Sequence, residues 1–382
     1  MIPQDASPAW RNPALDLLRA AAGISLFHLV FFSGYVETGF GLSQAAASGK
    51  AAALFARAAM RGALTLMSLG LCALDLFFVI SGFCCYQAAL SGKKSPITLA
   101  LRRYARFAPL YAAVAVPVFA YAGIPPRDML FHLAALDGGL FGSFVFSVFG
   151  HANYPYLFGL FCAVLFAPGI SRAARRPLTL AVLFAGLALW IGSGRAPGFL
   201  NFHACAFFLG ALAAALDASP WAARFPAPKS RARAALACLS GAALCLWSWT
   251  LWTHRGAAFL PLLTGTDGRT FVLALVSQSV SALLVLSLAR VPGGTGEAMG
   301  ASGRLSASVR KFGAAGLSFF TAFALYGLII GDLDLPGLSP FWTMAARYAA
   351  SLTASLVLCR FFHRYFERFP APAGVRRENR KA

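Results

Sequence analysis

The sequence predicts an all-α polytopic membrane protein with about ten transmembrane helices and both termini in the cytoplasm. Of its 382 residues, 59% are hydrophobic and only 12% are charged, and the mean hydropathy is +0.68. A chain with so little polar surface cannot cover a water-soluble globule of this size. The apolar segments are continuous runs of about 20 residues, which predict helices, whereas a membrane barrel needs alternating strands of about ten residues.

The predicted spans follow one another along the whole chain. Span one opens after Pro13, and its apolar run is too long for a cleavable signal peptide. Two outer loops, 37–67 and 124–153, exceed the usual connection length. The glycine-rich stretch 290–311 lacks the order of a phosphate-binding loop and predicts a linker. The ten spans lie at roughly 14–36, 68–91, 104–123, 154–171, 178–194, 199–216, 234–253, 270–289, 312–331 and 340–362.

The basic residues fix the predicted orientation. The formal net charge is +20, but most of the 33 lysines and arginines fall in the segments that are cytoplasmic when the N-terminus is inside. This distribution indicates positive-inside orientation and contact with anionic lipid, and it argues against nucleic acid as a partner. Arg347 lies inside a span, and only seven basic residues fall in outer loops: Lys50, Arg57, Arg61, Arg127, Arg195, Arg255 and Arg269.

The domain organisation is one membrane domain with short tails. Residues 1–13 form a cytoplasmic tail, 14–366 the ten-helix domain and 367–382 a basic cytoplasmic tail. All eight cysteines lie within or at the edges of spans, without a CxxC pair or a Cys/His cluster. They predict packing residues, and neither disulfides nor a metal site is expected.

The segment Asp75-Leu-Phe-Phe-Val-Ile-Ser-Gly-Phe83 places a carboxylate inside an apolar run. An aspartate at the centre of a membrane helix costs about 2.5 to 3.5 kcal/mol on insertion scales. Asp75 is therefore expected to face a polar interior and to find a partner there, either as an ion pair with Arg19 or in direct participation.

A second polar element, Arg102-Arg103-x-x-Arg106-x-x-Pro109-x-Tyr111, stands at the start of span three. Together with the Asp75 segment, it resembles the acyltransferase-3 family, the integral-membrane O-acyltransferases of bacterial surface glycans. Weaker resemblances are Asp16-x-x-Arg19 with His28, Phe207-Phe208-Leu-Gly210, Gly316-Leu-Ser318-Phe319, and Arg364-Tyr-Phe-Glu367-Arg-Phe-Pro370. The resemblance implies a multi-pass protein of the cell inner membrane.

The resemblance also implies a function. In that family an acyl group passes from cytoplasmic acyl-CoA to a sugar hydroxyl, and a span-one arginine and histidine are required. This gives His28 as the acid/base residue and Arg19 as the residue that orients or stabilises charge. Asp75 shapes the site. An imidazole suits this work because its unperturbed pKa lies near the operating pH.

The donor site is expected on the cytoplasmic side. Arg102, Arg103 and Arg106, with Tyr111, are the predicted binding residues for the phosphates of acetyl-CoA or another acyl-CoA, since guanidinium groups pair well with phosphate. No metal is implied. The expected partners are acyl-CoA, a glycan or lipid-linked sugar acceptor, and the lipid bilayer.

The sequence also departs from the family pattern. Arg19 and His28 are nine positions apart instead of eleven, and a nine-residue step places two side chains about 180° apart on a straight helix. The family's Trp-Ser-Leu-x-x-Glu segment appears only as Tyr154-Pro-Tyr156-Leu-Phe-Gly-Leu160. A non-catalytic member of the family therefore remains open. A transporter or flippase of a lipid-linked or anionic solute is the other alternative, since a solute could pass the same buried charges.

Overall fold

The computed structural model describes residues 13–37, 70, 72–90, 125–126, 177–193, 202–219, 230–255, 268–289, 337–338 and 340–362. Within these ranges every regular element is an α-helix, and no strand occurs. This confirms the all-α prediction for the described part of the chain. The helices are α1 (Pro13–Glu37), α4 (Ala73–Leu90), α9 (Pro177–Gly192), α10 (Phe202–Asp217), α12 (Ser230–Arg255), α14 (Gly268–Ala289) and α18 (Pro340–Phe362).

The helix boundaries follow the predicted spans closely. Three helices, α1, α9 and α18, begin at a proline, which suits the first helical position because its missing N–H would have no partner there. The largest difference is at α4, which begins at Ala73 and so places Asp75 in its first turn instead of its interior. The predicted spans at roughly 104–123, 154–171 and 312–331 lie outside the described residues.

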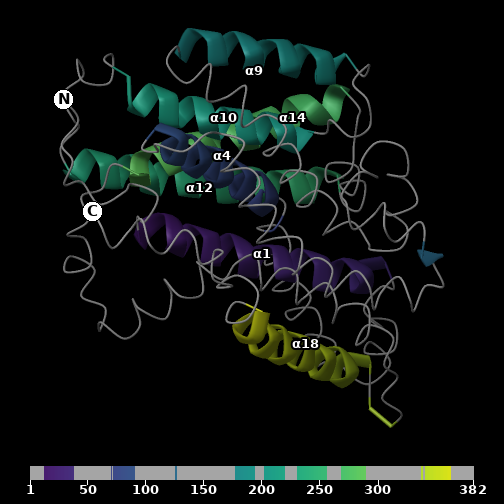
Figure 1. Cartoon of the computed structure of the whole chain (residues 1–382). Helices are drawn as coiled ribbons and strands as arrows, with labels where there is room; N and C mark the ends of the chain where they lie inside the picture. Colours follow the sequence, from purple (N-terminus) through teal and green to yellow (C-terminus); the bar gives the residue numbers. More distant parts are fainter. Residues whose placement is uncertain are drawn as a thin grey trace, which may run out of the picture.

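Helix α4 is at the centre of the packing. It contacts α1, α10 and α14, and Figure 1 shows it among these helices. The side chains of Leu76–Ile80 and Phe83–Tyr86 are all buried, so α4 has no face open to the surroundings over this stretch. A helix that is apolar and buried all round is typical of the middle of a large bundle.

Two glycines bring α4 and α10 into close contact. A Cβ atom at Gly82 would collide with the Phe207 carbonyl, and one at Gly210 would collide with the backbone of Val79. Both neighbours are main-chain atoms, so they cannot turn away as a side chain would. Small residues at such crossings let helix backbones approach closely, as is common in membrane proteins. Two segments of the family resemblance, those containing Asp75 and Phe207, therefore pack directly on each other.

Helices α1 and α4 run in opposite directions. The start of α4 is near the middle of α1, since Gly70 abuts Ser25 and Leu29, while Arg19 near the start of α1 reaches Cys84 towards the end of α4. Opposite directions are what the predicted order of spans requires of these two helices.

Two of the described helices are long and apolar enough to cross a membrane. The candidate spans are Ala232–Thr250 in α12 and Phe271–Ala289 in α14. Large apolar side chains point outwards on several helices, including Leu178 and Leu189 of α9 and Leu239 of α12, each at least two-thirds exposed. This exposure is the arrangement expected of surfaces that face lipid.

Candidate functional site

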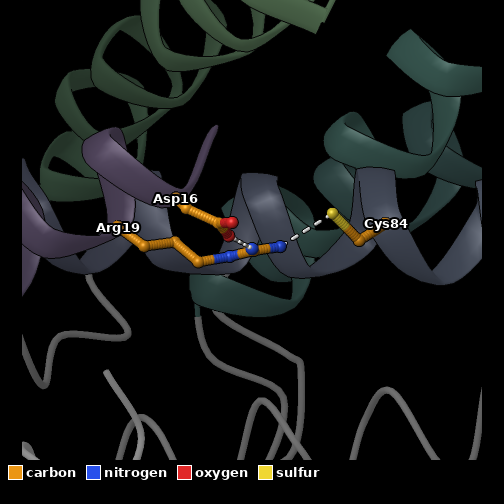
Figure 2. A network of polar contacts seen from close by, with 3 residues as sticks. All are labelled: Asp16, Arg19 and Cys84. Atoms are coloured by element: carbon orange, nitrogen blue, oxygen red, sulfur yellow. Dashed lines mark hydrogen bonds and ion pairs between the residues drawn. The ribbon is translucent and has the colours of Figure 1, made fainter. Parts of the chain in front are cut away.

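The first polar site joins α1 to α4 through Arg19. Asp16 lies in the first turn of α1, where a carboxylate is favoured by the helix dipole, and Arg19 follows one turn later. The guanidinium donates from Nη1 to Asp16 Oδ1 at 2.6 Å and from Nη2 to Cys84 Sγ at 2.8 Å. Figure 2 shows the arginine lying between the two acceptors. A forked cation can hold a carboxylate and a thiol together in this way, whereas a lysine has one nitrogen.

The second polar site joins α1 to α18 through His28. His28 is only 8% exposed, and its Nε2 lies 2.7 Å from the Tyr348 hydroxyl. The two rings are close to parallel, with centroids 5.8 Å apart. Phe27 and Phe31 both contact the Tyr348 ring edge-on, at centroid distances of 5.6 Å and 5.3 Å. The imidazole is therefore held beside a hydroxyl inside an aromatic cluster.

The third polar site surrounds Asp75 and joins α4 to α14. Asp75 is 5% exposed, so the prediction that it is buried and has a polar partner is confirmed. Ser277 Oγ donates to Asp75 Oδ2 at 2.5 Å, and Gln278 Nε2 donates to Asp75 Oδ1 at 3.2 Å. Each carboxylate oxygen thus accepts a hydrogen bond, which is what a buried polar group needs.

This site extends to α12. Cys72, the residue directly before α4, has Ser248 of α12 and Ser277 of α14 as neighbours. Ser281, one turn beyond Ser277, is fully buried, and its hydroxyl has no hydrogen-bond partner among the described residues. The junction of α4, α12 and α14 is accordingly a cluster of polar side chains inside an apolar bundle.

The three sites are separate places in the fold. Arg19 faces α4 and His28 faces α18, and α1 lies between these two helices in Figure 1. The prediction that Arg19 and His28 point apart is therefore confirmed. Cys84, the partner of Arg19, is nine residues beyond Asp75, about 13 Å further along α4 and on its opposite side. The geometry gives Asp75 hydroxyl and amide partners on α14 in place of the ion pair with Arg19 considered above.

The predicted donor-binding residues Arg102, Arg103, Arg106 and Tyr111 lie outside the described residues, and their role stays a prediction. Within the described ranges, no group of three or more His, Cys, Asp or Glu side chains could hold a metal ion. None of the seven cysteines described there forms a disulfide with another of them, and five are buried.

Tyr348, Ser277 and Gln278 are partners that sequence reasoning missed. Each lies more than 200 residues from the residue that it contacts. One signal was present in the sequence. Arg347, the cation inside span ten, directly precedes Tyr348, and a charged residue at this place in an apolar span indicates a polar contact nearby.

Comparison with protein-family models, with curated proteins and with solved structures found no match to this chain.

Proposed function

We propose that this chain is a membrane-bound O-acyltransferase. It would transfer an acyl group, in the simplest case acetyl, from cytoplasmic acyl-CoA to a hydroxyl of a cell-envelope or exported glycan or of a lipid-linked sugar. The observation that supports this best is the contact between His28 and Tyr348, because a buried imidazole held 2.7 Å from a hydroxyl is arranged to accept or return a proton. The motifs at Asp75 and Arg102 supply the family resemblance.

The chemistry requires three things of the protein. A base must take the proton of the acceptor hydroxyl, for which His28 is proposed. A fixed cation must orient the donor or stabilise its charge, for which Arg19 is proposed, since Asp16 and Cys84 hold its guanidinium in one orientation. Phosphate-binding groups must lie on the cytoplasmic side, for which Arg102, Arg103 and Arg106 are proposed.

The proposed membrane location is supported by the placement of polar and apolar side chains. The polar side chains of Asp75, Ser240 and Gln278 are buried, while large apolar side chains are exposed on α9, α12 and α18. Water-soluble proteins mostly show the reverse. In lipid, buried polar groups hold helices together and exposed apolar groups meet the acyl chains.

Acyl transfer from radiolabelled acetyl-CoA into extractable envelope glycan tests the proposal. Membranes would contain equal amounts of wild type, His28→Gln or Gly186→Ala. We expect His28→Gln to lower incorporation by about 100-fold or more, the usual effect of removing a general base. Gly186→Ala is the control, because a Cβ atom there meets nothing within 4 Å and should change nothing.

Two results would count against parts of this proposal. Wild-type membranes that incorporate no label while still binding acetyl-CoA would point to the non-catalytic family member. Incorporation that survives His28→Gln would remove His28 from the chemistry.

A separate variant, Arg103→Ala, tests the donor site. It should raise the KM for acetyl-CoA with little change in kcat, because the proposed role of Arg103 is donor binding.

A transporter or flippase is the second candidate, and the polar junction around Asp75 favours it. Ionisable residues buried within membrane helices often line the path of a solute or a proton. In sealed vesicles, a transporter would move a lipid-linked or anionic solute without acylating it, and Asp75→Asn would stop that movement. Asp75-dependent transport without label incorporation would therefore replace the enzyme proposal.

A further inference from the structure

Tyr348 has a place in the site that its sequence position does not suggest. We propose that Tyr348 is a proton relay between the acceptor hydroxyl and His28, an inference that rests on the proposed acyl transfer. Its hydroxyl lies 2.7 Å from His28 Nε2, and its ring packs on Phe27 and Phe31.

The direction of the hydrogen bond follows from the other ring nitrogen. We assign the backbone carbonyl of Ile24, one turn before His28, as the second partner of the imidazole. A carbonyl accepts and cannot donate, so the nitrogen facing it carries a proton. Because Nε2 faces Tyr348, that nitrogen is Nδ1. In the neutral ring Nε2 then has a lone pair, and the Tyr348 hydroxyl donates to it.

Accessibility places Tyr348 on the acceptor side of the pair. His28 is 8% exposed, whereas Tyr348 is half-buried. In the proposed relay the incoming hydroxyl therefore lies against the Tyr348 oxygen, on the more exposed side of the pair. That oxygen still has lone pairs when its own proton is directed at Nε2, so it can accept a hydrogen bond from the acceptor.

The transfer step balances as follows. The acceptor oxygen forms a bond to the thioester carbonyl carbon of acyl-CoA, and its proton moves to the Tyr348 oxygen. The Tyr348 proton moves to His28 Nε2, giving an imidazolium. The carbon–sulfur bond then breaks. The His28 imidazolium gives its Nε2 proton to the coenzyme A thiolate and becomes neutral again. The products are an acyl ester and coenzyme A, and both side chains return to their starting forms.

The test uses Tyr348→Phe, which keeps the aromatic ring and removes only the hydroxyl. Trp342→Phe is the matched control, since Trp342 is on the same helix and is 62% exposed. We expect Tyr348→Phe to lower kcat at least about tenfold with an unchanged KM for acetyl-CoA, because proton transfer is slowed and donor binding is not. In a His28→Gln background the same change should have no further effect, because the relay acts through His28.

A second readout is independent of activity. Full-length protein labelled with ¹⁵N-histidine in lipid nanodiscs reports which ring nitrogen of His28 is protonated, with the signals assigned by their loss in His28→Gln. Wild type should show the Nδ1–H form, and Tyr348→Phe should keep that form but show a shifted Nε2 signal, because the variant loses only the hydrogen bond at Nε2. An Nε2–H form in wild type would overturn the relay.

The two proposals fail in different ways. Wild type that transfers no acyl group but shows the Nδ1–H form would contradict the proposed acyltransferase activity and would still support the hydrogen-bond assignment. Wild type that is active, with Tyr348→Phe equally active, would sink the relay and leave the enzyme standing. A fall in activity matched by a fall in folded protein, absent in Trp342→Phe, would assign Tyr348 to packing and also overturn the relay.

Discussion

Asp75 illustrates what a buried carboxylate requires of its neighbours. Its first-turn position in α4 gives it the favourable end of the helix dipole, and its two oxygens accept from Ser277 and Gln278. Removing the acceptor leaves two buried donors without that partner, and each such loss costs about 1 to 3 kcal/mol. Removing one donor is a smaller change, because the carboxylate keeps the other.

Asp75→Leu should therefore destabilise the protein by about 2 to 6 kcal/mol. Asp75→Asn should cost less, because the amide oxygen can still accept one of the two hydrogen bonds. The measurement is thermal unfolding of detergent-solubilised protein. Adding Ser277→Ala to Asp75→Leu should recover part of the loss, since it removes a stranded donor. Equal destabilisation by Leu and Asn would show that the hydrogen bonds to Asp75 contribute little.

For single residues, the sequence predicts which ionisable side chains are placed unusually inside apolar runs. It does not predict which residues these side chains contact. Asp75, Arg19 and His28 are identifiable because ionisable groups inside apolar runs are costly. Their partners are not, because the period of a helix fixes which side chains share a face and leaves open which helix that face contacts. Tyr348 and Ser277 are ordinary residues until the fold brings them to His28 and Asp75.

Helices were easier to predict than their contacts. The runs predicted at roughly 14–36 and 270–289 correspond to α1 and α14 within two residues at each end. The prediction was less accurate for α4, whose apolar run extends before the helix begins at Ala73. Hydropathy measures how apolar a segment is, and an apolar segment continues into the turn before a helix without a break.

The crossing of α4 and α10 gives a prediction at the scale of elements. Gly82→Ala or Gly210→Ala should lower the stability by about 1 to 3 kcal/mol, because the new methyl group meets main-chain atoms of the other helix. Thermal melting in one detergent is the measurement. The controls are Gly186→Ala and Gly241→Ala, where a Cβ atom has open space. These should be neutral or stabilising by up to about 1 kcal/mol, from helix propensity. Gly82→Ala melting at the control temperature would contradict the close approach.

For the whole molecule, the exposed cysteines of α12 test whether its apolar surface faces lipid. Cys238 and Cys245 are exposed in the protein, yet both lie within the candidate span Ala232–Thr250. In intact membranes a water-soluble maleimide should leave both unlabelled, since their thiols would be among acyl chains. After solubilisation and denaturation both should react, as peptide mass spectrometry would show.

The control for that experiment is a cysteine placed at the end of a helix. Ala218 follows α10 directly and is exposed, so Ala218→Cys should react without solubilisation or denaturation when the reagent can reach both faces of the membrane. Rapid labelling of Cys238 and Cys245 in intact membranes would show that α12 is in water and would exclude it as a span.

The hydrogen bonds of Asp75 also have a consequence for how the protein is made. The chain leaves the ribosome from its N-terminus, and Ser277 is synthesised 202 residues after Asp75. At about 5 to 20 residues per second, the aspartate waits roughly 10 to 40 seconds for its partners from α14. During that interval the nascent segment lacks both of these hydrogen bonds. In the proposed membrane protein, α4 would therefore reach its final depth only after α14 has been made, late in biogenesis.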